Sequence, residues 1–195
     1  MRLLLIGAPG AGKGTQAQRI ADHFGLVHIS SGDLLRKHVA EDTATGRSVR
    51  AYMDRGDLVP DAVVLDMLRK PVIAAAAAGG YVLDGFPRTV EQAQQAYGVA
   101  KELGVAVQLA VFLEVPREEL VSRIVARGLS SGRTDDTREV VENRLAVYEQ
   151  QTSPILDYYR RRERLISVNG NRPVDEVTWS VVVQLQRARR ALDKQ

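Results

Sequence analysis

The chain has 195 residues, of which 45% are hydrophobic and 26% charged, and its formal net charge is +3. This length suits one substantial α/β domain with small inserted lobes, and the composition is typical of a globular protein. The absence of cysteine excludes disulfides and thiolate metal sites, and no apolar stretch is long enough to span a membrane. Because the N-terminus lacks a signal-peptide pattern, we expect a cytoplasmic protein without a membrane partner.

The first predicted element is a short buried strand over residues 2–6, which leads directly into GAPGAGKGT at residues 7–15. Its glycines let the backbone curl around an anion and direct successive N–H groups at it. The helix predicted over 13–23 adds the positive end of its dipole, and Lys13 supplies a mobile positive charge for the outer phosphates. Glycine-rich turns also join strands to helices without binding anything, but the lysine and the strand-to-helix context favour a polyphosphate-binding loop.

One residue departs from the general phosphate-loop pattern. The position after the lysine is usually Ser or Thr, whose hydroxyl contacts magnesium. Here that position is Gly14, and Thr15 follows it. We therefore expect the magnesium ion to be held through water rather than directly by a hydroxyl of the loop.

The remaining elements alternate between short apolar runs and helical segments. Strands are predicted at 27–29, 81–84, 108–114 and 165–168, and helices at 32–40, 47–55, 61–78, 90–103, 117–127, 137–160 and 174–192. This alternation predicts a five-stranded parallel sheet with helices on both faces. The segment from about 30 to 60 has no strand and predicts an inserted lobe, residues 128–136 are expected to be loop-like, and Pro71 is expected to kink or split its helix.

Further polar segments lie near the predicted strand ends, where ligands bind in open α/β sheets. They are HISSGDLLR at 28–36, GDLVPD at 56–61, DGFPRTVEQ at 84–92, and the series Arg123, Arg127, Arg133 and Arg144. Arg123 and Arg127 are four residues apart and share one helix face. Phosphoryl transfer between nucleotides gathers many negative oxygens without a covalent intermediate, and a phosphate loop with converging arginines meets that need.

In this order, the loop and these segments closely resemble the adenylate kinases of the nucleoside monophosphate kinase family, over essentially the whole chain. The resemblance implies a P-loop NTPase fold with a helical AMP-binding lobe at about 30–59 and a short lid at about 126–136. It implies reversible phosphoryl transfer from Mg-ATP to AMP, giving two ADP, by a monomer that uses Mg²⁺ and no zinc. The arginine-rich segments at 160–164 and 187–194 lack interleaved aromatic residues, so we expect no nucleic-acid partner.

The resemblance also implies roles for individual residues. The ATP site would comprise Gly10, Ala11, Gly12, Lys13, Gly14, Thr15, Arg127 and, through its backbone at the base, Arg172. The AMP site would comprise Ser31, Arg36, Asp57, Leu58, Val59, Gly85, Phe86, Pro87, Arg88, Gln92, Arg133 and Arg144. The catalytic set would be Lys13, Arg88, Arg123, Arg127, Arg133 and Arg144, and Asp84 would orient the water molecules of Mg²⁺.

Three of these residues have simpler structural interpretations. Ser31, or its neighbour Ser30, can cap the helix that follows. Asp84 can be a turn-forming residue after its strand. Arg133 can be a solvated loop residue.

The sequence departs from the family pattern in the lid and at one AMP-site residue. Many bacterial members have a long lid between the positions of Arg127 and Arg133, where this chain has only GLSSG. Ser31 stands where threonine is most common, which keeps the hydroxyl and loses a methyl group. The short lid puts in doubt a large separate lid motion, but not the chemistry.

Two alternative functions remain open at this point. A UMP/CMP kinase would share the loop, the short lid and the arginines, but those enzymes usually have asparagine where this chain has Gln92 and alanine where it has Ser31. A nucleotide-binding regulatory module without turnover would leave the arginines unexplained. A guanine-nucleotide switch would also need an NKxD-type motif and a hydroxyl in place of Gly14.

Overall fold

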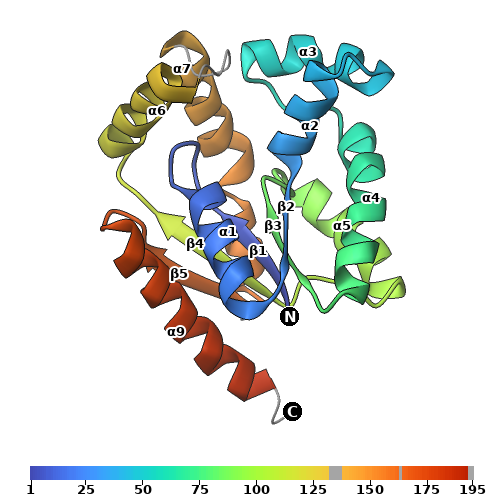
Figure 1. The fold of residues 1–195 in the computed structure, drawn as a ribbon, viewed down its shortest axis with the longest axis vertical. Coiled ribbons are helices and arrows are strands. Elements are labelled where there is room, and N and C mark those ends of the chain that lie inside the picture. Colours follow the sequence, from blue (N-terminus) through green and yellow to red (C-terminus); the bar gives the residue numbers. More distant parts are fainter. Residues whose placement is uncertain (132–137, 163, 193–195) are drawn as a thin grey trace.

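The computed structural model describes residues 1–131, 138–162 and 164–192, and within them five parallel strands form one sheet (Figure 1). The strands are β1 Arg2–Ile6, β2 Val27–Ser30, β3 Tyr81–Asp84, β4 Leu109–Glu114 and β5 Leu165–Asn169, in the order β2-β3-β1-β4-β5. Leu5 at the centre of the sheet pairs with Asp84 of β3 and with Val111 of β4. The predicted α/β fold class and all five predicted strands are confirmed.

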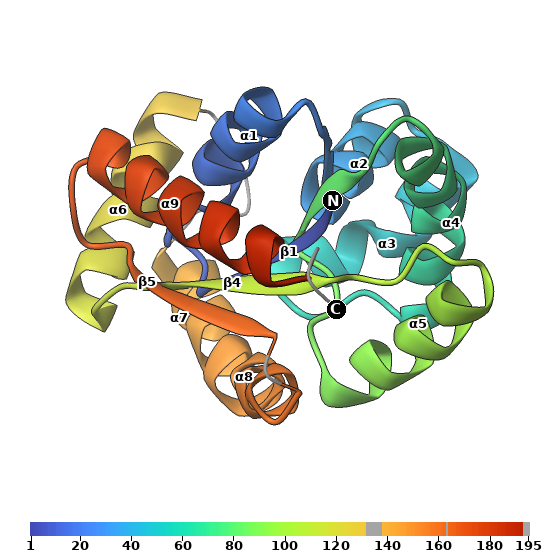
Figure 2. The same ribbon diagram turned by 90° about the horizontal axis from the view of Figure 1, so that it is seen from below.

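Helices connect the strands and cover both faces of the sheet. They are α1 Lys13–Phe24, α2 Ser31–Ala40, α3 Ala44–Arg55, α4 Asp61–Ala77, α5 Val90–Glu102, α6 Arg117–Ser131, α7 Arg138–Val147, the π-helical turn η2 Tyr148–Thr152, α8 Ile155–Arg160 and α9 Val174–Leu192. Figure 2 shows α1 and α9 on one face of the sheet and α5 and α8 on the other. Among the described residues, no helix is both long enough and apolar enough to cross a bilayer.

Several helix predictions need correction. The single helix expected over 137–160 is divided, because the chain widens into η2, where the Ser153 N–H donates to the Tyr148 carbonyl at 2.8 Å, and Pro154 then has no N–H to continue the ladder. Residues 129–131, expected to be loop-like, extend α6, since one glycine at position 128 costs a helix only about 1 kcal/mol. The helix α4 is not split by Pro71. It packs through Leu68 and Ala75 on either side of the proline.

The period of two along β1 divides the core between the two faces of the sheet. Leu3 and Leu5 pack in one cluster with apolar residues of α1, α6 and α9, while Leu4 and Ile6 pack in the other with residues of α2, α4 and α8. Each of these four side chains is at most 4% exposed. The strand that leads into the glycine-rich loop is therefore fixed from both sides.

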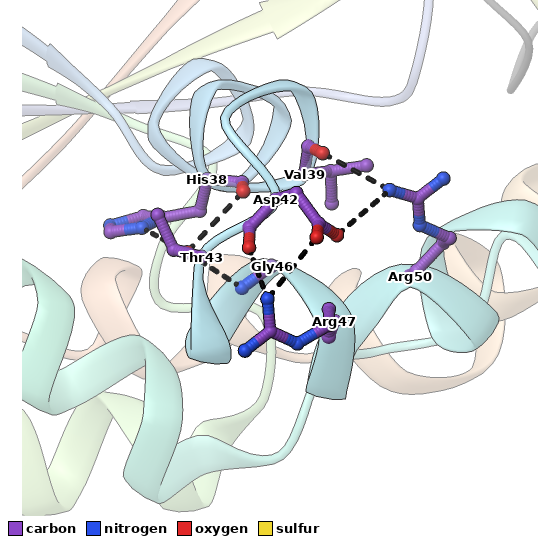
Figure 3. A network of polar contacts seen from close by, with 7 residues as sticks. All are labelled: His38, Val39, Asp42, Thr43, Gly46, Arg47 and Arg50. Atoms are coloured by element: carbon purple, nitrogen blue, oxygen red, sulfur yellow. Dashed lines mark hydrogen bonds and ion pairs between the residues drawn. The ribbon is translucent and has the colours of Figure 1, made fainter.

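The corner between α2 and α3 is held by a dense polar network (Figure 3). Thr43 caps α3, which begins three residues earlier than expected, and its Oγ1 accepts from the Gly46 N–H at 3.0 Å. The carboxylate of Asp42 contacts Arg47 at 3.2 Å and Arg50 at 3.7 Å. A Cβ on Gly46 would lie 2.0 Å from the His38 carbonyl oxygen, so α2 and α3 approach each other as closely as their backbones allow.

The strands end on the side of the sheet where these two helices stand. Figure 1 shows α2 and α3 on one side of the loop after β1, and α6 and α7 on the other. The two helix pairs touch through Asn143 of α7, whose amide donates to the Arg55 carbonyl oxygen at 2.7 Å and to Oδ1 of Asp57 at 3.1 Å. The loop between them is the centre of the candidate site.

Candidate functional site

The glycine-rich loop has the conformation that an anion-binding loop requires. Gly10 and Gly12 have φ angles of 83° and 89°, in the left-handed region that disfavours other residues. A Cβ on Gly10 would also lie 2.8 Å from the Leu120 carbonyl oxygen, so the loop packs directly on α6. The helix α1 begins at Lys13 with Gly12 at its N-cap, a residue without a side chain to occupy the first N–H groups. These N–H groups and the helix dipole are thus available to a phosphate.

Lys13 is turned back onto its own loop. Its Nζ donates to the carbonyl oxygens of Gly7 at 2.8 Å and Ala8 at 3.0 Å. Burial lowers the pKa of Lys13 to about 8, and the nearby carboxylate of Asp84 offsets part of this effect. The lysine is partly buried, and its two carbonyl partners replace only part of the water that its ammonium group has lost.

Three of the predicted arginines converge on this lysine. Arg88, Arg144 and Arg127 each lower the pKa of Lys13 further through charge repulsion. They come from the β3–α5 loop, from α7 and from α6, so the fold brings together residues that are far apart in the sequence. Such a concentration of positive charge attracts anions, and it matches a site for several phosphates.

Asp84 lies at the end of β3, beside the loop. Asp84 is 7% exposed, and within the described part of the chain its Oδ1 has no hydrogen-bond partner. Its Oδ2 would lie 3.8 Å from a Cβ on Gly14. A buried carboxylate oxygen without a protein donor favours the interpretation of Asp84 as a residue that contacts a hydrated divalent cation. It does not favour the interpretation of Asp84 as a simple turn-forming residue. Among the described residues, no cluster of three or more His, Cys, Asp or Glu side chains could hold a metal ion.

A second, tightly closed site lies beside the phosphate loop. Its lining residues are Ser31, Leu35, Leu58, Val59, Val64, Gly85, Phe86, Arg88 and Gln92, and the space among them measures about 20 Å³. Seven of these nine belong to the predicted AMP site; Leu35 and Val64 are the additions. The sequence could have indicated both, because they follow the helical period of apolar residues on α2 and α4.

Ser31 is available for a ligand in this site. The helix cap of α2 is Ser30, whose Oγ accepts from the Asp33 N–H at 3.2 Å. Ser31 itself is 1% exposed, and its Oγ has no partner among the residues that the structure describes. A buried hydroxyl without a partner is costly to the fold, and a polar group of a bound molecule could satisfy it.

Gln92 is the other buried polar group of this site, at 2% exposed. Its Oε1 accepts from the Arg88 N–H at 2.6 Å, and its Nε2 donates to Oδ1 of Asp61 at 2.6 Å. Asp61 begins α4 and belongs to the GDLVPD segment, but no local pattern in the sequence indicates a role for it. A role for Asp61 is indicated only by its hydrogen bond with Gln92, which lies 31 residues away in the sequence.

The remaining predicted residues lie around these two sites. Arg36 pairs with Asp33 at 2.6 Å, and Asp57 accepts from Arg55 at 2.7 Å and from Asn143. These hydrogen bonds, the one from Arg55 first, lower the pKa of Asp57. Asn143 was also missed, since nothing local marks it.

The other arginines are placed differently. The guanidinium of Arg123 contacts Glu119 at 2.8 Å, the Gly170 carbonyl oxygen at 3.1 Å and Asn171 at 3.1 Å. This ties α6 to the loop after β5, beside the exposed Arg172, which lies 3.6 Å from Glu176. Arg133 and the rest of the expected lid from 132 to 136 lie outside the described residues, whereas 126–131 belong to the end of α6.

The chain as a whole is similar to known nucleotide kinases. A family model described as adenylate kinase matches residues 5–164. A protein named adenylate kinase from Leptospira biflexa is 45% identical over 181 residues, which cover 93% of this chain and 97% of the relative. Proteins of the same name from Rhodococcus erythropolis and Trichodesmium erythraeum are 45% identical over 185 residues and 42% over 192; each match covers at least 95% of this chain and 98% of the relative.

Proposed function

This chain belongs to the adenylate kinase family, and we propose from that premise that it transfers a phosphoryl group reversibly from Mg-ATP to AMP, giving two molecules of ADP. The family match favours this phosphotransferase over a UMP/CMP kinase and over a regulatory module without turnover. The observation that carries the proposal is the convergence of Arg88, Arg127 and Arg144 on Lys13, between the phosphate loop and the closed site of Ser31 and Gln92.

The donor nucleotide is assigned to the phosphate loop. Backbone N–H groups from Gly10 to Thr15 would bind its phosphates, and Lys13 would leave the loop carbonyls to reach the outer ones. Arg127 would contact the same phosphates. The backbone at Arg172 would contact the base, an assignment that rests on the resemblance alone.

The acceptor nucleotide is assigned to the closed site. Its base would lie against Gln92 and the apolar side chains, and its phosphate would lie near Arg88, whose Nε donates to the Gly85 carbonyl oxygen at 2.7 Å. The 20 Å³ space is far too small for an adenine, so the lobe of α2 and α3, residues about 30–59, has to move away to admit AMP. It would then close together with the lid, residues about 126–136, and exclude water.

The chemistry needs positioning and charge neutralisation rather than a general base. The attacking oxygen belongs to a monophosphate that is already an anion. Lys13, Arg88, Arg127 and Arg144 would neutralise the charge that gathers on the transferring group. We further propose, from the family resemblance, a monomeric enzyme that acts on free nucleotides in the cytoplasm.

Asp84 is the residue that would hold Mg²⁺, through water. The unpartnered, buried Oδ1 of this carboxylate fits such a role, and the substitution of Gly14 for the usual hydroxyl residue leaves the metal without a direct ligand from the loop. When bound with ATP, the ion supplies additional neutralisation of phosphate charge.

The proposal is tested by mixing the protein with Mg-ATP and, separately, AMP, CMP, UMP, GMP and dTMP, and following diphosphate formation by phosphorus NMR. Rapid formation of ADP with AMP alone is the expected result. Preferential turnover of CMP or UMP would keep the fold and the mechanism but overturn the acceptor. Absence of transfer to every monophosphate would overturn the proposed activity.

A further inference from the structure

The amide of Gln92 is held at both ends by groups of opposite character. At its oxygen end, the Arg88 N–H can only donate; at its nitrogen end, the Asp61 carboxylate can only accept. Both contacts measure 2.6 Å. The backbone of Gln92 is fixed as well, because its N–H donates to the Thr89 Oγ1 at 3.1 Å. If the amide turned by 180°, its NH₂ group would face the Arg88 N–H donor and its oxygen would face the Asp61 carboxylate. Both hydrogen bonds would then be lost.

This clamp leaves a defined pair of functions for a ligand. An amide oxygen has two lone pairs and an amide nitrogen has two hydrogens. One of each is engaged by Arg88 and Asp61, which leaves one acceptor on Oε1 and one donor on Nε2 of a side chain that lines the closed site. The polarity of this pair is fixed before any nucleotide binds.

The fixed polarity matches adenine and opposes the 6-oxopurines. Adenine presents a donating amino group at position 6 beside an accepting N1, which complements the free acceptor and donor of Gln92. Hypoxanthine and guanine present an accepting oxygen beside a donating N1–H. Against the fixed amide of Gln92, the base oxygen would face the acceptor Oε1, and the N1–H would face the donor Nε2. Neither contact could form a hydrogen bond, and leaving these buried polar groups unpaired lowers the affinity for the ligand strongly.

We propose that Asp61 is a positioning residue that makes the acceptor site selective for adenine over 6-oxopurine nucleotides, by fixing the orientation of the Gln92 amide. This inference rests on the proposed assignment of the closed site to AMP. Asp61 is suited to the role because it lies in the first turn of α4, where the helix dipole favours a carboxylate, and because a carboxylate cannot donate to a turned Gln92 oxygen. An asparagine in its place can accept or donate, so it would no longer enforce one orientation.

The test compares Asp61→Asn with the unmodified enzyme on AMP and on inosine monophosphate, whose base differs from adenine at this edge. The expected result is a fall of about tenfold in the ratio of kcat/KM for AMP to that for inosine monophosphate, through a higher KM for AMP, with KM for ATP unchanged. Asp66→Asn is the matched control: it removes the same charge from an exposed position of α4 and should leave the ratio unchanged.

An unchanged ratio in Asp61→Asn would overturn the role of Asp61, whereas an unmodified enzyme that fails to phosphorylate AMP would overturn the proposed function instead. A second measurement does not depend on whether Asp61→Asn folds normally. In the unmodified protein, the Nε2 protons of Gln92, assigned by their loss in Gln92→Asn, should give separate NMR signals, one of them strongly downfield because it is bonded to a carboxylate. Two signals at ordinary amide positions would contradict the clamp.

Discussion

The Nζ of Lys13 lies 2.8 Å from the carbonyl oxygen of Gly7, six residues earlier in the same loop. The lysine thus stabilises the loop with the group that the proposed mechanism assigns to the phosphates of ATP. Binding of ATP exchanges two neutral carbonyl partners for anionic oxygens, and this exchange changes the protonation of the lysine. The first prediction follows from that change.

The affinity for ATP should fall as the pH rises above about 8. Burial sets the pKa of Lys13 to about 8 in the free protein, and bound phosphates raise the pKa because they favour the ammonium form. Above pH 8, binding therefore takes up a proton, and affinity falls by up to about tenfold per pH unit. Calorimetry in two buffers of different ionisation enthalpy counts this proton. Lys13→Arg remains charged and should show no uptake in this range.

Lys13→Met should lower kcat by about two to three orders of magnitude, because it removes a positive charge from the transferring group. Initial rates with saturating Mg-ATP and AMP measure the effect, and denaturant unfolding verifies that the variant is folded. Retention of nearly full activity would refute the assignment of Lys13 to the phosphates.

Gln92→Asn should raise the dissociation constant of AMP by about tenfold or more and leave that of ATP within about twofold. The shorter side chain cannot reach Arg88, Asp61 and a base at once. Calorimetric titration with each nucleotide gives both constants, and Gln95→Asn, at an exposed position of the same helix, is the control. Equal losses for both nucleotides would show that Gln92 does not read the base.

Asn143→Ala should increase the rate of AMP release by about fivefold, the effect of losing a net hydrogen bond. The amide of Asn143 joins α7 to the end of α3 through Arg55 and Asp57, and this connection has to break when the lobe opens. Stopped-flow displacement measures the rate. If release is no faster in the variant, the connection does not restrain the lobe.

Gly46→Ala should destabilise the protein by about 3 kcal/mol or more, since the added Cβ would overlap the His38 carbonyl oxygen at the corner drawn in Figure 3. Gly98→Ala offers a control of opposite sign: among the described residues nothing lies within 4 Å of its new Cβ, and alanine stabilises a helix by about 0.5–1 kcal/mol relative to glycine. Urea unfolding of both variants gives the two values.

The strands and the phosphate loop were predictable from the sequence because each depends on local pattern. A buried parallel strand is a short apolar run, and Lys13 with its glycines forms a continuous motif. The division at 148–154 was only partly predictable: Pro154 is a local signal for a helix break, but the wide turn of η2 depends on packing that buries Thr152.

Contacts between distant residues account for the rest of what sequence reasoning missed. The resemblance gave Gln92 a role, but its partner Asp61 lies 31 residues away. Asn143 and Asp57 are 86 residues apart and have no spacing in common. The choice between Ser30 and Ser31 as the cap of α2 was open from the sequence, because either serine can serve and only the backbone decides.

The 20 Å³ space of the closed site holds about one water molecule, and if AMP binds there as proposed, capture of the acceptor has to wait for the lobe to open. A nucleotide cannot enter while α2 and α3 stay in place, so at high AMP concentration the observed association rate should level off at the rate at which the lobe swings outward. At AMP concentrations below this limit, tighter binding in the closed site increases the rate of capture. At higher concentrations, only faster opening of the lobe of α2 and α3 increases that rate.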